Sequence, residues 1–159
     1  MSIFKTPAEI VEIAVRIERN GVKFYQYLSE NVKDDDAKDV FSFLASEEEK
    51  HVGIFRQMLD EVADYTPRYS YPGEYGLFLD ELASSAVESL KNYEEALKSK
   101  DFEEAIKLGI KVELQSIVYY SELYDLLPDK LNEVIKKVVD EEKKHYLELK
   151  GIQKLNHLK

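Results

Sequence analysis

Two short segments of the sequence place a histidine three residues after a glutamate. The first, EEEKH, contains Glu48 and ends at His51, and the second, EEKKH, contains Glu142 and ends at His145. Residues three apart lie on the same face of an α-helix, so each pair could bind one metal ion or share a bridging carboxylate. The chain has three histidines in all, and two of them occur in this arrangement. The repeat therefore indicates a metal site to which both segments contribute.

Two further glutamates interrupt the apolar face of a predicted helix. Glu18 occurs in AVRIERNGVKFYQYL and Glu113 in GIKVELQSIVYYSEL. In both segments a small residue precedes the glutamate by four positions, another follows it by three, and a tyrosine, Tyr25 or Tyr120, follows it by seven. Together with the repeated histidine motif, this pattern predicts two similar hairpins. A bundle in which the hairpins are related by a pseudo-two-fold axis would bring the glutamates and histidines together.

The sequence pattern predicts that these glutamates are buried, and their burial favours a role in metal binding. A single glutamate beside an apolar stripe is usually a surface residue. Four carboxylates buried without partners would each cost at least several kcal/mol, even after relaxation. A marginally stable domain cannot absorb that cost. Two divalent cations would balance the four negative charges, so a site for two metal ions resolves the conflict.

Apolar residues at helical spacing predict four long helices and an all-α fold. The helices run from 7 to about 31, through 40–62, from the turn after residue 101 through 123, and from about 129 through 152. The first and second helices are joined by a short connection, as are the third and fourth, and each pair forms an antiparallel hairpin. The middle connection, about 63–100, is long enough to cross the length of a bundle. This is a ferritin-like four-helix bundle with one long crossover connection, and we predict one domain over 1–159.

Local signals mark where these helices begin and how the crossover is built. Thr6 with Glu9 and Asp101 with Glu104 each fit a capping box, and the polar turn KDDDAKD supplies an aspartate cap. Within the crossover, ADYTPRYSYPGEYG at 63–76 is typical of a loop because it contains two prolines and two glycines. Residues 77–99 are expected to form shorter helical pieces.

The composition excludes several classes of protein. The formal net charge of −10 argues against a nucleic-acid partner, because phosphate binding needs clustered lysine and arginine. The chain contains no cysteine, which excludes disulfides, thiolate zinc sites and rubredoxin-type iron sites within it. The sequence has no apolar run long enough to span a membrane and no secretory signal at its start. We therefore expect a cytoplasmic protein.

Four segments of the chain resemble the rubrerythrin-like branch of the ferritin-like di-iron carboxylate superfamily. They are AVRIERNGVKFY, SEEEKH, VELQSIVYY and DEEKKH. The resemblance extends over nearly the whole chain. It implies two iron ions, with a di-manganese or mixed pair as alternatives. The implied ligands, which would act in catalysis through the metals, are Glu18, Glu48, His51, Glu113, Glu142 and His145. We expect Glu48 and Glu142 to bridge the two metals and the other four ligands to be terminal.

The resemblance also implies roles for residues around the ligands. In related families the residue just before each Glu-x-x-His motif can hold the free nitrogen of the opposite histidine. Here that would pair Glu47 with His145 and Glu141 with His51, and exposure of both glutamates to solvent is the alternative. Tyr25 and Tyr120 resemble the tyrosines that donate hydrogen bonds to ligand carboxylates, with plain aromatic packing as the alternative.

The chain departs from rubrerythrins in two respects. It contains none of the cysteines of their C-terminal rubredoxin domain, so we expect that domain to be missing, and Ser116 stands where they tend to carry an additional ligand glutamate. The remaining ligand set of four glutamates and two histidines is closer to that of bacterioferritin. Both departures weaken the case for rubrerythrin-style peroxidase activity with NADH, so electrons would have to come from a separate protein or small reductant.

The expected function is reduction of hydrogen peroxide or O2 at a diferrous centre, as a defence against oxidative stress. A separate electron-donor protein such as a rubredoxin would re-reduce the centre. The alternatives are a ferroxidase or iron-handling protein, which oxidises Fe(II) without peroxidase turnover, and a structural metal bundle without redox activity. The tyrosine-rich segment YTPRYSYPGEYG, together with the family resemblance, further predicts a homodimer.

Overall fold

The described part of the chain is almost entirely helical. The computed structural model describes residues 6–66, 73–91, 98 and 101–157, which contain no strand. The elements in chain order are α1 (Pro7–Asn31), α2 (Asp35–Val62), α3 (Gly73–Lys91), α5 (Phe102–Leu126), the 3-10 helix η1 (Asp129–Leu131) and α6 (Asn132–His157). None of the helices in this part of the chain is long and apolar enough to cross a membrane.

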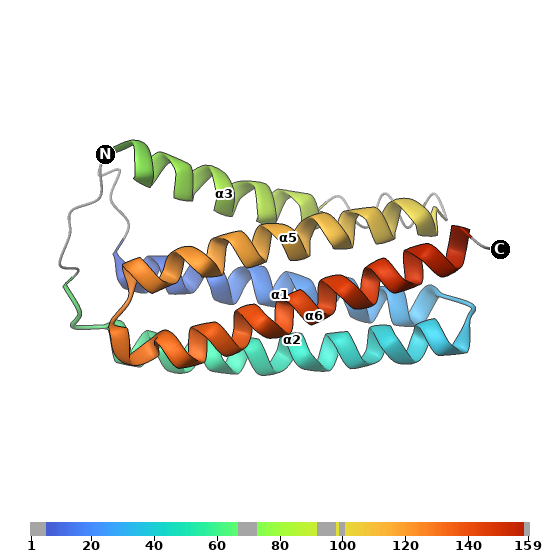
Figure 1. Cartoon of the computed structure of the whole chain (residues 1–159), viewed down its shortest axis with the longest axis horizontal. Coiled ribbons are helices and arrows are strands. Elements are labelled where there is room, and N and C mark those ends of the chain that lie inside the picture. The colour runs from blue at the N-terminus through green and yellow to red at the C-terminus, as the bar shows by residue number, and fades with distance from the viewer. Residues whose placement is uncertain (1–5, 67–72, 92–97, 99–100, 158–159) are drawn as a thin grey trace.

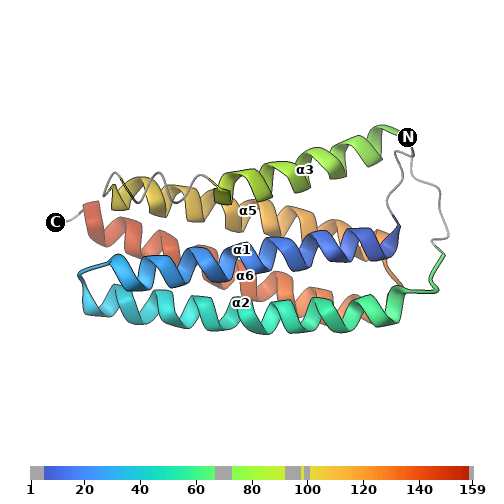
Figure 2. The same cartoon turned by 180° about the vertical axis from the view of Figure 1, so that it is seen from behind.

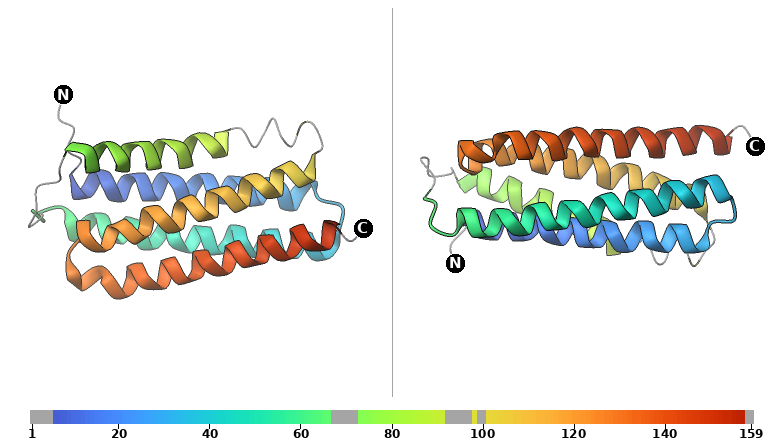
Figure 3. Two further views of the ribbon diagram at one scale, coloured as in Figure 1. Left: turned by 45° about the horizontal axis from the view of Figure 1, so that its top comes forward. Right: turned by 90° about the horizontal axis from the view of Figure 1, so that it is seen from below.

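Four of the helices form the predicted bundle. Figure 1 shows α1, α2, α5 and α6 running side by side along the long axis of the molecule, and Figure 2 shows the same arrangement from behind. Helices α1 and α2 form one antiparallel hairpin and α5 and α6 form the other, and the two hairpins lie against each other in both views of Figure 3. Helix α2 ends at one end of the bundle and α5 begins at the other, and α3 runs along the bundle between these two ends. The predicted ferritin-like four-helix bundle with one long crossover is therefore confirmed.

The ends of the helices follow the capping signals in the sequence. Thr6 accepts a hydrogen bond from the backbone N–H of Glu9 at 3.1 Å, and the Glu9 carboxylate accepts one from the backbone N–H of Thr6 at 2.9 Å, which completes a capping box. Asp34 caps α2 by accepting from the N–H of Ala37. At the start of α5 only half of the predicted box forms. Asp101 accepts from the N–H of Glu104, but the Glu104 carboxylate accepts instead from Lys107.

The crossover is more regular than predicted. The predicted loop over 63–76 is wrong at its end, because α3 begins at Gly73, and the shorter helical pieces expected after residue 77 form one continuous helix as far as Lys91. The helix tolerates Gly76, although a glycine inside a helix costs about 1 kcal/mol, because α3 packs against α5 and α1. Its residues Leu79 and Ala83 are buried in that contact. The part of the predicted crossover at 67–72, 92–97 and 99–100 lies outside the described residues.

The hydrophobic core is divided into two clusters along the bundle. One contains Ile10, Ala14, Phe55 and Tyr120 and lies where α1 begins and α2 ends. The other surrounds Phe24 and lies toward the opposite end of the same hairpin. Between the clusters, the side chains that point inward are polar. This buried polar layer interrupts the core in the middle of the bundle and marks the candidate site.

Candidate metal centre

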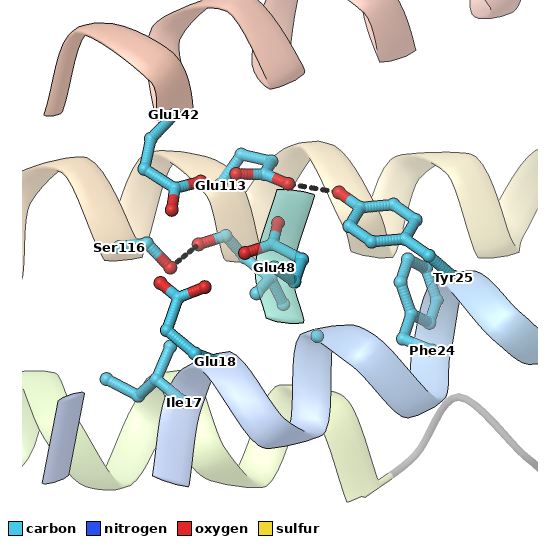
Figure 4. A pocket seen from close by; sticks show the side chains of 10 residues that line it. Ile17, Glu18, Phe24, Tyr25, Glu48, Glu113, Ser116 and Glu142 are labelled. Carbon is cyan, nitrogen blue, oxygen red and sulfur yellow. Dashed lines mark hydrogen bonds between the residues drawn. The ribbon is translucent and has the colours of Figure 1, made fainter. Parts of the chain in front are cut away.

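Six ionisable side chains meet in the buried polar layer. Helix α1 contributes Glu18, α5 contributes Glu113, and α2 and α6 each contribute one glutamate–histidine pair. All six residues are at most 3 % exposed. Figure 4 shows the four glutamates converging from their separate helices on one space. The six residues are Glu18, Glu48, His51, Glu113, Glu142 and His145, so the structure brings together every ligand expected from the sequence.

These six residues form two overlapping groups of four. The first group is Glu18, Glu48, His51 and Glu142, and the second is Glu48, Glu113, Glu142 and His145. Within each group one donor atom from every residue lies within 4.8 Å of the others. Only Glu48 and Glu142 belong to both groups. Carboxylates shared in this way have the position that bridging ligands between two metal ions would need.

Both histidines point the same ring nitrogen at the carboxylates. Nδ1 of His51 lies 2.8 Å from Oε1 of Glu142 and 3.5 Å from Oε2 of Glu48. Nδ1 of His145 lies 3.1 Å from Oε1 of Glu48 and 3.2 Å from Oε2 of Glu142. The two imidazole rings are stacked, with centroids 5.6 Å apart. Each histidine therefore offers Nδ1 to a metal ion and keeps Nε2 for an outer partner.

Two buried tyrosines hold the two glutamates that belong to one group each. The Tyr120 hydroxyl donates to Oε1 of Glu18, and the Tyr25 hydroxyl donates to Oε1 of Glu113. The second of these bonds is drawn in Figure 4. Each tyrosine reaches from one hairpin to the glutamate of the other, so the two bonds obey the pseudo-two-fold relation seen in the sequence. The tyrosines thus act as hydrogen-bond donors as well as packing in the aromatic core.

The outer partners of the histidines do not obey that relation. Nε2 of His51 donates to Oε2 of Glu141 over 2.8 Å, which is the pairing expected from the family resemblance. The corresponding Glu47 carboxylate instead accepts from the ammonium group of Lys50 on its own helix. The sequence already contained this alternative partner, because Lys50 follows Glu47 by three positions and i,i+3 pairs of opposite charge attract on a helix surface.

In the metal-free centre, the pKa values of three of the four buried carboxyl groups are raised. Burial, together with the charges of Glu18 and Glu113, raises the pKa of Glu48 to about 8. Burial and the charge of Glu142 raise the pKa of Glu113 well above its usual range, and burial and its acidic neighbours also raise the pKa of Glu142. Burial works in the same direction on Glu18, but close contacts with Glu48 and His51 outweigh it and lower the pKa of Glu18 to about 2.

Both histidines favour the charged form. Burial disfavours an imidazolium, but the carboxylates of Glu142 and Glu48 outweigh it and raise the pKa of His145 to about 11. The pKa of His51 is also raised, because the carboxylates that face it, Glu142 first among them, outweigh the burial. Protons in the metal-free centre therefore take the place that cations would occupy in a loaded one.

The arrangement fits two metal ions. Three buried atoms face one another without an aligned hydrogen bond, although two of them are only 2.8 Å apart: Oε2 of Glu18, Nδ1 of His51 and Oε1 of Glu142. Buried polar atoms without partners are rare in native proteins, and a cation among them would satisfy all three. Carboxylate oxygens and imidazole nitrogens are the ligand types that suit Fe(II) or Mn(II).

A small cavity adjoins the carboxylates on the side away from the histidines. It has room for about one water molecule, and its wall includes Gly21 from α1 and Ser116 from α5. The hydroxyl of Ser116 donates to the backbone carbonyl of Val112 over 2.9 Å. No carboxylate extends from that position, which agrees with the departure from the rubrerythrin pattern noted in the sequence.

Comparison with known proteins identifies the family. Residues 9–153 match a family model described as Rubrerythrin. The chain belongs to the rubrerythrin family. It is also similar to the crystal structure of a candidate ferritin-like diiron-carboxylate protein from Thermotoga maritima. The two chains are 30 % identical and superpose with a TM-score of 0.70, and the match covers 94 % of this chain and 95 % of that one. No curated protein sequence matches the chain.

Membership of the rubrerythrin family confirms the resemblance seen in the sequence and supports a centre of two metal ions. The chain contains no cysteine, so no cysteine-bound iron site can form within it. Sequence reasoning found the six inward-facing donors. It left open the outer contacts, and it missed that Lys50 competes for Glu47.

Proposed function

We propose that this rubrerythrin family member is a redox enzyme that reduces hydrogen peroxide or O2 at a centre of two iron ions. The observation that carries the proposal is the pair of buried four-residue groups that share Glu48 and Glu142. When bound, two Fe(II) ions would supply the two electrons that, with two protons, convert hydrogen peroxide into two water molecules. A role in defence against oxidative stress is part of the proposal.

The protein's own contribution is to hold the donors and to restrict access. Tyr120 binds Oε1 of Glu18 and leaves Oε2 facing the centre. Glu141 fixes the orientation of the His51 ring through Nε2. The cavity beside Gly21 is lined by the ligand glutamates and has room for a molecule of about the size of water. Peroxide and O2, with two heavy atoms each, are small molecules of the kind that suits a cavity of this size.

A ferroxidase or iron-handling function is the second candidate. The observation that favours it is Ser116, whose hydroxyl is bound to a backbone carbonyl and leaves the centre with four glutamates and two histidines. In this case Fe(II) is the substrate, and Fe(III) leaves the protein or is stored. Slow turnover with peroxide together with release of Fe(III) would favour this function over peroxide reduction.

The partners of the enzyme belong to the same proposal. The chain has no cysteine for a second iron site, so electrons would come from a separate donor protein, such as a rubredoxin, or from a small reductant. We also propose a homodimer in the cytoplasm. Residues 67–72 of the tyrosine-rich segment on which the dimer was predicted lie outside the described residues. The mass in solution at micromolar concentration tests the dimer directly.

Anaerobic loading with Fe(II) tests the function. The loaded protein is mixed with one equivalent of hydrogen peroxide, or with O2, and oxidation of the iron is followed by absorbance. Oxidation by peroxide that is much faster than oxidation by O2, followed by repeated turnover with an added reductant, is the expected result. A loaded sample whose spectrum does not respond to either oxidant would contradict the redox function and favour a structural metal bundle.

A further inference from the structure

The two halves of the centre differ although their ligands are matched. We call the first group of four residues the Glu18–His51 position and the second the Glu113–His145 position. The Glu18–His51 position has an outer carboxylate, because Glu141 accepts from Nε2 of its histidine over 2.8 Å. The Glu113–His145 position has no such contact in the described part of the chain, because the corresponding glutamate is bound to a lysine.

A second difference lies inside the centre. In the Glu18–His51 position, Nδ1 of the histidine lies 2.8 Å from Oε1 of Glu142. In the other position, Nδ1 of His145 lies 3.1 Å from Oε1 of Glu48 and 3.2 Å from Oε2 of Glu142. Nδ1 of His145 lies 4.0 Å from Oε1 of Glu113, whereas Nδ1 of His51 lies 3.4 Å from Oε2 of Glu18.

Both differences favour the same position. A carboxylate that accepts a hydrogen bond from the far nitrogen of a ligand imidazole fixes the ring and raises its basicity, and losing such a partner typically costs about 10–100-fold in metal affinity. The donors of the Glu18–His51 position also lie closer together, so an ion that enters it requires less rearrangement of its ligands.

We propose that the two metal positions are inequivalent, with the first ion bound tightly at Glu18–His51 and the second bound more weakly, and exchanged more readily, at Glu113–His145. Glu141 is the positioning residue that separates them. The inference rests on the metal-binding part of the proposed function and not on the redox reaction. It also gives this centre one retained and one exchangeable metal ion, which suits a protein that takes up iron from solution.

Anaerobic titration of the metal-free protein with Co(II) tests the inference. Calorimetry gives the two affinities, and the absorption bands of Co(II) report the surroundings of each ion as it binds. The expected result for the wild type is two steps, with the first at least about tenfold tighter than the second. His145→Ala should keep one tightly bound ion, whereas His51→Ala should retain only weak binding.

Glu141→Gln and Glu47→Gln are a matched pair, because the two residues occupy corresponding places in the two hairpins. Glu141→Gln should weaken the first step about 10–100-fold and change the Co(II) bands in the first half of the titration only. A general loss of structure would instead weaken both steps. Glu47→Gln should change neither affinity by more than about twofold, because Glu47 contacts Lys50 and not a ligand.

Two ions that bind the wild type with equal affinity would overturn the inference and leave the proposed function intact. Equal weakening by Glu141→Gln and Glu47→Gln would also overturn it, as would a tight ion that survives in His51→Ala but not in His145→Ala. A folded wild-type protein that binds no ion at all would refute the proposed function itself.

Discussion

Loading the centre with metal at pH 7 should release about four protons for each pair of ions bound. Four groups hold protons in the metal-free state. Both histidines have raised pKa values, that of His145 to about 11, the pKa of Glu48 is raised to about 8, and that of Glu113 is raised well above its usual range. Glu18, with a pKa of about 2, is already ionised. Burial raises the pKa of Glu142, but hydrogen bonds from both histidines oppose the shift, and we count this carboxylate as ionised.

The charges of the two states support this number. Two imidazolium groups balanced by two ionised carboxylates make the metal-free centre neutral, and two divalent ions balanced by four carboxylates make the loaded centre neutral. The exchange is therefore two ions for about four protons, and the affinity for each ion should fall about 100-fold for each unit that the pH is lowered below 7. Raising the pH through 8 removes the proton of Glu48 before loading, so the number released should fall toward three.

Calorimetric titration with Mn(II) measures the number of protons released on loading. Mn(II) is used because, unlike Fe(II), it does not react with O2 during the titration. The same titration is carried out in two buffers with different ionisation enthalpies, and the difference in apparent heat gives the number of protons. Glu113→Gln is the matched control, because its amide imitates the protonated carboxyl group and should remove about one proton from the total. Heats that do not depend on the buffer, or fewer than two protons per pair of ions, would refute the reasoning.

Three further predictions concern stability. The raised pKa values of Glu48 and His145 stabilise the metal-free fold fully at a pH below their ordinary pKa values, 4.5 for the glutamate and 6.5 for the histidine. This stabilisation is lost as the pH rises through the raised values of about 8 and 11. The melting temperature of the metal-free protein should therefore fall from pH 6 to pH 9 relative to that of the loaded protein. Gly109→Ala places a methyl group 2.9 Å from the Phe24 ring, and the cost of overpacking, about 1–3 kcal/mol, should outweigh a gain of about 1 kcal/mol in helix propensity. The methyl group of Gly53→Ala meets nothing within 4 Å, so this variant should stabilise the fold. Chemical denaturation of both variants measures the two effects. Tyr120→Phe removes a hydrogen bond to the Glu18 carboxylate, so it should lower the free energy of unfolding of the metal-free protein by about 2 kcal/mol. Chemical denaturation measures this change, and an unchanged midpoint would show that the bond contributes nothing to stability.

The six donors could be predicted because they conflict with the pattern around them. A glutamate on the apolar stripe of a long helix is costly to bury, and the chain repeats the conflict at matching places in two hairpins. Helical periodicity then determines which side chains face inward, so Glu18 and Glu113 could be assigned without coordinates. The cap at Thr6 marked the start of α1, and the apolar stripe marked the end of α2 at Val62, as observed. Helix α2 begins at Asp35, before the predicted apolar stripe, because Asp34 in the polar turn caps it.

Features that depend on small energy differences could not be predicted. Glu47 could bind either the opposite histidine or a lysine on its own helix, and surface pairs of this kind differ by a few tenths of a kcal/mol. The segment that begins at Gly73 has the residues of a loop, yet it is helical because α3 packs against an apolar surface on α1 and α5. That surface exists only after the hairpins have assembled, so no local pattern in the sequence records it.

Each hairpin carries half of the donors, Glu18, Glu48 and His51 on α1 and α2 and the other three on α5 and α6. Two copies of a single hairpin, associated about a two-fold axis, would therefore contain a complete centre. The crossover links the two hairpins covalently, so their association is intramolecular. Each hairpin then meets the other at an effective concentration in the millimolar range. If the chain is cut after Tyr65, that advantage is lost and the metal ions become the link between two fragments. The fragments should then stay together while the ions are bound and separate when a chelator removes them.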